Sequence, residues 1–330
     1  MRSPGEYIPG GRASVSATLS WDECPAAFWF DRVLHVPSKD RAYYILGGEL
    51  HKVQEWLLTL KRSQQPLATE AEVTEQIQKD LAEHLAAPET VIFADKETPE
   101  ILTEDAIEMA RVWMREVLPR IEPFGLEVRV GPEDGLVLPT SGTPVTAYLD
   151  VVDQDGYIVD LKTSKRKWSE DEEDTQRRLS TIVYAWAFRI KFGSPPAAFR
   201  YDVLVRKARG KTRPQAETEY QPIKVVPDLR LEAGALRRME AIVAQMKAGQ
   251  YYPVKARHCD DCSFAEFCTA HFQSAPPAPW CELGAPAPVD GPRYLQGGGD
   301  AGRAPADRRS ARGRRRRATC GTLPNGEEAG

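Results

Sequence analysis

The segment at 145–163 constrains the fold most, because it predicts two β-strands joined by a tight turn. Residues 145–152 and 157–163 are rich in Val, Ile, Leu, Tyr and Thr, which favour strands. The intervening Asp-Gln-Asp-Gly contains an Asp-Gly pair, which is a strong signal for a hairpin turn. We therefore expect two adjacent antiparallel strands here.

Charged side chains interrupt this apolar hairpin. Because side chains alternate along a strand, Asp160 and Lys162 are expected on one face, with Val159 and Leu161 on the other. Asp150 can reach the same place from the neighbouring strand. Carboxylates are hard oxygen ligands for Mg²⁺ or Mn²⁺. A bound metal with a nearby lysine can activate a water molecule for attack on a phosphodiester. The alternative is an exposed ion pair between Asp160 and Lys162, worth under ~1 kcal/mol.

The run 158–165, Ile-Val-Asp-Leu-Lys-Thr-Ser-Lys, resembles motifs of the PD-(D/E)XK nuclease superfamily, and in particular its RecB-like branch. In that branch a helical histidine lies upstream in a G-x-x-x-H setting, which Gly47 and His51 match. The resemblance implies that Lys162 activates water and that cleavage leaves a 5′-phosphate. It also implies a metal site whose ligands are His51, Asp150, Asp160 and the backbone carbonyl of Leu161. The alternative for His51 is a solvent-facing position on its helix.

The same branch carries a Q-x-x-x-Y pattern on the helix after the hairpin. Tyr184 matches the tyrosine, and the resemblance implies that it belongs to the catalytic set, whereas Ser180 stands where glutamine is expected. Gln176, one turn earlier, could replace that glutamine only in part. Core packing is the alternative for Tyr184.

A cysteine cluster near residue 260 supplies a second argument. Cys259, Cys262 and Cys268 form a C-x2-C-x5-C pattern, and such close spacing is typical of metal binding. The chain is similar to RecB-like nucleases with a C-terminal cysteine cluster, such as AddB and the CRISPR-adaptation exonucleases. This resemblance implies a [4Fe-4S] cluster whose fourth ligand is Cys24, in an N-terminal Cys-Pro pair. The spacing leaves open a zinc site completed by His271. Disulfides are disfavoured, because the N-terminus has no signal-peptide pattern and a reducing compartment is expected.

Composition agrees with a soluble, cytoplasmic enzyme. The chain has 330 residues, 42% hydrophobic and 28% charged, which suffices for a full core. No apolar run is long enough to span a membrane, so no membrane association is expected. The net charge is −4, and residues 276–330 carry nine Lys or Arg against six Asp or Glu, which leaves −7 for the remainder. DNA binding is then expected from local basic patches at 165–167, 177–178 and 206–213.

The order of predicted elements indicates an α/β fold with a mixed central sheet flanked by helices, a restriction-endonuclease-like core and an N-terminal helical region. Strands are expected within 126–163 and near 198–206 and 217–225, and helices at 13–34, 46–62, 69–87, 102–120, 170–192 and 228–249. The helices at 69–87 and 102–120 are expected to cap the cleft. The predicted divisions are a flexible N-terminus at 1–12, a helical region with Cys24 and His51 at 13–125, the nuclease core and cysteine cluster at 126–275, and a disordered Pro/Gly/Arg-rich tail with Cys281 and Cys320 at 276–330.

The resemblance implies a metal-dependent DNA nuclease, and specifically an exonuclease on single-stranded DNA or DNA ends. Recombination, repair, phage replication or CRISPR adaptation is the expected setting, with a helicase or recombination protein as partner. No P-loop is present, so the chain has no helicase motor of its own. The alternatives are a non-catalytic iron-sulfur subunit that binds DNA or acts as a scaffold, and a zinc-stabilised partner protein.

Overall fold

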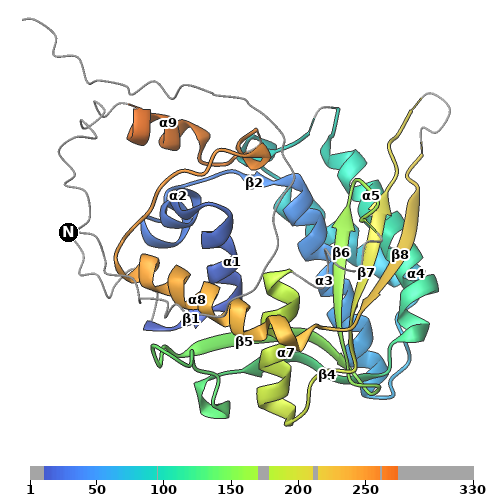
Figure 1. Ribbon diagram of the computed structural model, residues 1–330. Coiled ribbons are helices and arrows are strands. Elements are labelled where there is room, and N and C mark those ends of the chain that lie inside the picture. The colour runs from blue at the N-terminus through green and yellow to red at the C-terminus, as the bar shows by residue number, and fades with distance from the viewer. Residues whose placement is uncertain (1–10, 95, 170–177, 211–214, 261, 274–330) are drawn as a thin grey trace, which may run out of the picture. The chain divides into compact units, whose positions relative to one another are not determined.

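A six-stranded mixed sheet contains the predicted hairpin (Figure 1). The computed structural model describes residues 11–94, 96–169, 178–210, 215–260 and 262–273. In the hairpin, β5 (Val145–Asp153) and β6 (Tyr157–Ser164) pair in antiparallel fashion. The Gly156 N–H donates to the Asp153 carbonyl at 3.0 Å. Gly156 has a φ of 77°, which glycine adopts without steric cost. The predicted turn is therefore confirmed.

The sheet runs in the order β1-β5-β6-β7-β8, and β4 also pairs with β5. β6 and β7 are parallel, which places Asp160 beside Tyr201, and β7 and β8 are antiparallel. A separate small sheet joins β2 and β3. The mixed sheet confirms the predicted fold class. The remaining strands are β1 (Ala13–Ser14), β2 (Asp40–Arg41), β3 (Val91–Ile92), β4 (Pro123–Val130), β7 (Ala198–Arg206) and β8 (Thr218–Val225).

The pairing of β5 with β6 does not include Asp150. The two strands pair at Val151 and Val152, whereas β4 pairs with β5 from Ala147 to Asp153 and β1 pairs with its first two residues. In Figure 1 the two strands run in clearly different directions. The divergence leaves Asp150 at the point where the sheet divides, so its side chain has space in front of it.

Helices cover both faces of the sheet (Figure 1). On β6, Ile158 belongs to one hydrophobic cluster, while Val159 and Leu161 belong to the other, as the predicted alternation requires. The first cluster involves α1 (Val15–Glu23), α7 (Leu179–Phe192) and α8 (Glu232–Lys247). The second involves α3 (Ala42–Arg62), α4 (Glu70–His84) and α5 (Pro99–Val112).

The expectation that the helices after α3 cap the cleft is wrong. Ile77 of α4 and Met109 of α5 are fully buried in the cluster that contains Leu161 and Leu204 of the sheet. Their apolar faces therefore pack with α3 and the sheet, because burial of those side chains against a second layer is what stabilises an amphipathic helix.

The expected continuous helix at 13–34 is also wrong, because the chain breaks at Cys24. Cys24 has extended dihedral angles, φ −158° and ψ 103°, and it separates α1 from α2 (Pro25–Phe28). The cause is Pro25, whose ring disfavours the helical conformation of the preceding residue. A π-helical segment, Trp29–Val33, follows α2.

Other helix boundaries differ by a few residues from the predicted ones. α5 continues through a π-helical turn and a 3₁₀ turn to Arg120. α7 begins at Leu179, and 170–177 of the predicted helix lie outside the described residues. The further short helical segments are 3₁₀ turns at Pro88–Thr90, Pro132–Asp134, Leu229–Leu231 and Arg257–Cys259, and the helix α9 at Ala265–Gln273.

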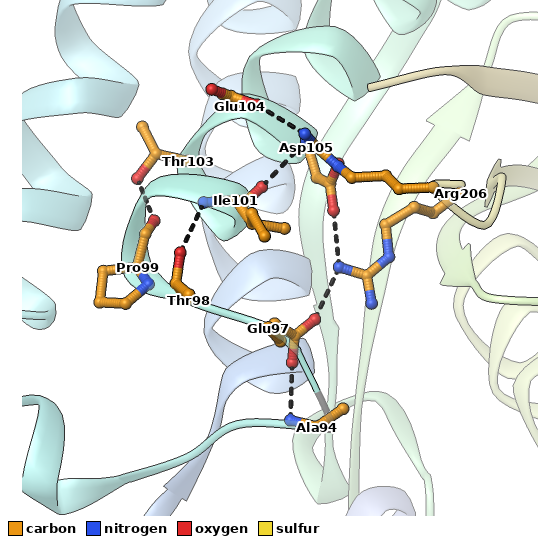
Figure 2. Close-up of polar contacts among 10 residues, drawn as sticks. Ala94, Glu97, Thr98, Pro99, Ile101, Thr103, Glu104, Asp105 and Arg206 are labelled. Carbon is orange, nitrogen blue, oxygen red and sulfur yellow. Dashed lines mark hydrogen bonds and ion pairs between the residues drawn. The ribbon is translucent and has the colours of Figure 1, made fainter. Parts of the chain in front are cut away.

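A buried ion-pair network joins α5 to the end of β7 (Figure 2). The Nη1 atom of Arg206 lies 2.7 Å from Asp105 Oδ2 and 2.7 Å from Glu97 Oε1. Arg209 pairs with the other oxygen of Asp105 at 2.7 Å, and with Glu104. Asp105 is only 3% exposed. The carboxylates therefore neutralise Arg206 and Arg209, which belong to one of the basic patches predicted from the sequence.

The contacts group Met1–Pro276 into one compact unit and the following residues into another. Residues 276–330, with Cys281 and Cys320, lie outside the described part of the chain, as do residues 1–10. The predicted divisions remain predictions.

Among the residues that the structure describes, none of the helices is both long and apolar enough to cross a bilayer.

Candidate metal centre and cysteine cluster

Three predicted metal ligands converge from three different elements. One ligand atom each from His51 of α3, Asp150 of β5 and Asp160 of β6 lies within 4.8 Å of the other two. His51 Nδ1 is 3.6 Å from Asp150 Oδ2. An imidazole and two carboxylates at this separation can share one divalent cation, since metal–ligand distances are about 2.0–2.6 Å.

Gly47 explains how α3 approaches the sheet. A Cβ atom added at Gly47 would lie 3.6 Å from Thr163 Oγ1, so the helix passes close beside β6. One turn later, His51 faces the same strand. Burial lowers the pKa of His51, although Asp160 and a hydrogen bond to the Leu161 backbone act in the opposite direction. The imidazole is therefore biased toward the neutral, metal-binding form, with the Leu161 carbonyl beside it.

The two carboxylates are electrostatically strained without a cation. Burial, followed by repulsion from Asp160, raises the pKa of Asp150 from 3.8 to about 7. A divalent cation between them would offset this repulsion, because opposite charge favours the ionised form of a carboxyl group.

Lys162 is held by one of these acids. Its Nζ lies 2.7 Å from Asp160 Oδ1, so the ion pair expected from strand alternation is present. Burial alone would lower the pKa of Lys162, but Asp160 and Asp150 more than compensate and raise it. The side chain therefore stays an ammonium group, suited to orienting water and stabilising negative charge rather than to acting as a free base.

A cavity of about 280 Å³ opens beside these residues. Burial and the neighbouring acids raise the pKa of Tyr184, so its phenol remains a hydrogen-bond donor. Tyr184 also packs against the core, as its alternative interpretation expects, and its place in the catalytic set stays a prediction. Gln176 lies outside the described residues. The lining side chains are Leu19, Tyr148, Leu149, Asp150, Ile158, Val159, Asp160, Lys162, Arg178, Ser180, Tyr184, Phe199 and Tyr201.

Sequence reasoning missed two residues of this site. Tyr201 lines the cavity because the parallel register places it beside Asp160, which no local pattern reveals. Glu127 of β4 acts on the pKa of both Asp150 and Tyr184, so its carboxylate lies in the same electrostatic environment. The position of Glu127, in a predicted strand that pairs with β5, is the only sequence signal for it.

Most residues of the predicted basic patches form ion pairs, line another cavity or lie outside the described residues. Lys167 pairs with Glu219. Lys165 lines a different cavity of about 380 Å³, together with Arg206, Lys207 and Arg209. Lys211 and Arg213 lie outside the described residues, as does Arg177. Arg178 is the one residue of these patches, within the described ranges, that lines the cavity with the acids.

The fold brings the four predicted cluster cysteines together. Cys24, Cys259, Cys262 and Cys268 all line one cavity of about 460 Å³. Burial and then the proximity of the other three thiols raise the pKa of Cys268. The aromatic side chains of Phe30 and Phe264 pack around them. Residues at opposite ends of the described chain therefore meet at one site.

A tetrahedral zinc site would need a compact set of ligand atoms. Zn–S bonds of about 2.3 Å would place the sulfur atoms about 3.8 Å apart. Within the described residues, no three cysteine or histidine atoms of this region lie within 4.8 Å of one another. The His271 ring packs near Trp29, at 5.9 Å, and Phe272, at 4.8 Å between ring centroids, and its role as a zinc ligand stays a prediction.

The chain is similar to known proteins in sequence and in structure. The chain is similar to a crystal structure from Eubacterium rectale described as a "putative exonuclease", with 16% identity, a TM-score of 0.47, and coverage of 79% of this chain and 92% of the other. A structure of a protein named SSO0001 aligns with 14% identity, a TM-score of 0.32, and coverage of 69% and 95%. No curated protein matches. The family model of the PD-(D/E)XK nuclease superfamily matches residues 12–269, and the chain therefore belongs to that superfamily.

Proposed function

We propose that this nuclease is a metal-dependent deoxyribonuclease of the RecB-like branch, and that it acts as an exonuclease on single-stranded DNA or DNA ends. One observation carries the proposal: His51, Asp150 and Asp160 converge beside a lysine that is paired with Asp160. Two acids, an imidazole and an ammonium group at one cavity match the chemistry of phosphodiester hydrolysis.

His51, Asp150, Asp160 and the Leu161 carbonyl would hold Mg²⁺ or Mn²⁺, whose charge lowers the pKa of water and offsets negative charge on the phosphate. Lys162 would orient the attacking water through its N–H donors and stabilise the developing charge. Its raised pKa supports this role over proton abstraction. Tyr184, protonated and facing the cavity, would donate a hydrogen bond to the DNA backbone.

We also propose a [4Fe-4S] cluster at Cys24, Cys259, Cys262 and Cys268. Support comes from the shared cavity and from the proximity of the other three thiols to Cys268. The cluster would tie the helices near Cys24 to the C-terminal end of the domain, with thiolates as its ligands. A visible absorption spectrum with iron and zinc analysis tests this proposal, since a zinc protein is colourless.

Nuclease assays with labelled single-stranded and double-stranded DNA in Mg²⁺ or Mn²⁺ test the activity. Asp160→Asn and Lys162→Ala are each expected to lower turnover by on the order of 10²-fold or more. Asp22→Asn, which removes an acid paired with Arg238 elsewhere on the surface, is expected to leave turnover unchanged. Wild-type turnover in the Asp160 or Lys162 variant would contradict the mechanism. DNA binding without cleavage by the wild type would favour the non-catalytic subunit.

A helicase or recombination partner, and a role in recombination, repair, phage replication or CRISPR adaptation, remain predictions from the resemblance. Cytoplasmic localisation remains a prediction from the composition and the N-terminal sequence.

A further inference from the structure

Arg178 is an exposed arginine beside the acids of the proposed metal site. It is the N-cap residue of α7, its side chain is exposed, and it lines the same cavity as Asp150, Asp160 and Lys162. Its guanidinium carbon lies 4.2 Å from the centre of the Trp168 ring. In the described part of the chain, no carboxylate forms an ion pair with it.

Trp168 is itself fixed in place, so it can position the arginine. Its backbone N–H donates to Gln221 Oε1 at 2.9 Å, and the Gln221 amide nitrogen donates back to the Trp168 carbonyl at 3.0 Å. The ring lies 5.5 Å from Tyr201, which stacks on Phe199 at 4.6 Å. The rings of Phe199, Tyr201 and Trp168 thus form a continuous row of contacts from the core to the Arg178 guanidinium.

Other arginines near the sheet are neutralised, which distinguishes Arg178 from them. Arg200 pairs with Asp202, and Arg206 and Arg209 pair with Asp105. A ring face attracts a guanidinium without cancelling its charge. Among the described residues Arg178 therefore has no carboxylate partner, and its contact with the ring leaves its N–H donors able to bind an anion that enters the cavity.

We propose that Arg178, held by Trp168, binds a phosphate of the substrate strand next to the scissile phosphate. This inference rests on the proposed nuclease function and names the contact that positions the strand. A planar guanidinium can bind two phosphate oxygens at once, which a lysine cannot. Its place at the N-terminus of α7, a helix of 14 residues, adds favourable electrostatics for an anion.

The salt dependence of DNA binding tests the contact directly. The full chain is titrated with a fluorescent single-stranded oligonucleotide in Ca²⁺, at several salt concentrations, to suppress cleavage. Each phosphate contact with single-stranded DNA contributes about 0.7 to the slope of log affinity against log salt. Arg178→Ala is expected to reduce that slope by about 0.7 and to weaken binding roughly tenfold at low salt. A merely structural role would not change the slope.

Two further variants separate charge from geometry. Arg178→Lys keeps the charge, so the slope is expected to stay at the wild-type value while affinity remains below it. Arg238→Ala is the matched control, since Arg238 is an exposed arginine paired with Asp22, and it should change neither quantity. Circular dichroism verifies that each variant is folded.

The possible failures are distinguishable. Wild-type slope and affinity in Arg178→Ala, with a wild type that cleaves DNA, would overturn the phosphate contact alone. A wild type that neither binds nor cleaves DNA would overturn the proposed function and this inference with it.

Discussion

Asp150 is the residue whose charge depends most on what occupies the site. Its carboxyl group faces Asp160 in a partly buried setting, and burial is the larger cause of its raised pKa. Lys162 compensates only in part, because it is already paired with Asp160. The metal-free site therefore favours a proton at Asp150, and a divalent cation would compete with that proton.

This competition predicts how the stability of the metal-free protein changes with pH. The unfolded chain releases the Asp150 proton near pH 3.8, whereas the folded chain holds it to about pH 7. The unfolded state thus binds fewer protons in this window, so the contribution of Asp150 to the free energy of unfolding falls as pH rises from 3.8 to about 7. Urea unfolding in the presence of a chelator, across this pH range, measures the change. The free energy of unfolding of the Asp150→Asn variant is expected to increase relative to that of the wild type as pH rises. A constant difference between the two proteins would contradict the assigned environment.

Part of this site follows from local sequence patterns, and the rest depends on tertiary contacts. Strand alternation predicts that Asp160 and Lys162 share a face, because that relation is local. The approach of His51 depends on the close passage of α3 beside Thr163, which is a tertiary contact. The position of Tyr201 depends on the parallel register of β6 and β7. Long-range registers of this kind leave no periodic signal in the residues themselves.

At the scale of elements, α3 carries adjacent glycines in its interior. Glycine costs about 1 kcal/mol relative to alanine inside a helix. A Cβ atom at Gly48 would meet nothing within 4 Å, and Gly48 has no left-handed φ to preserve. The helix therefore tolerates a side chain at this position without repacking.

Gly48→Ala is accordingly expected to raise the free energy of unfolding by up to about 1 kcal/mol. Gly193 is the matched contrast, because it ends α7 with a φ of 78°. Gly193→Ala should lower stability by about 1 kcal/mol, since alanine is strained in the left-handed region. Chemical denaturation measures both values, and changes of the same sign in the two variants would refute the argument.

The network between α5 and β7 leads to a larger expected loss. Asp105 is 3% exposed and accepts from both Arg206 and Arg209. Asp105→Asn would remove the negative charge that neutralises these two arginines in a buried setting. The free energy of unfolding is expected to fall by roughly 3–5 kcal/mol. Glu104→Gln serves as the control, because the Glu104 side chain is 61% exposed and its pair with Arg209 should contribute under about 1 kcal/mol. Equal losses in the two variants, measured by denaturant unfolding, would show that burial does not decide the effect.

Over the whole molecule, the order of elements was predictable and several junctions were not. The predicted order of strand, helix and strand favours parallel pairing of β6 with β7, because the connection between two parallel strands is usually a helix. The break at Cys24 follows from Pro25, whose effect on the preceding residue outweighs the helical pattern around it. The same break presents Cys24 to the cavity of the C-terminal cysteines.

The meeting of Cys24 with Cys259, Cys262 and Cys268 gives the last prediction. A bridging cluster would close a loop of more than two hundred residues, and long closed loops restrict the unfolded chain most. Cys24→Ser should therefore lose the visible absorbance and lower the unfolding temperature, whereas Cys281→Ser, outside the proposed ligand set, should do neither. If Cys24→Ser kept full iron content and the wild-type unfolding temperature, the cysteines at 259–268 would have to bind their metal without the N-terminal segment.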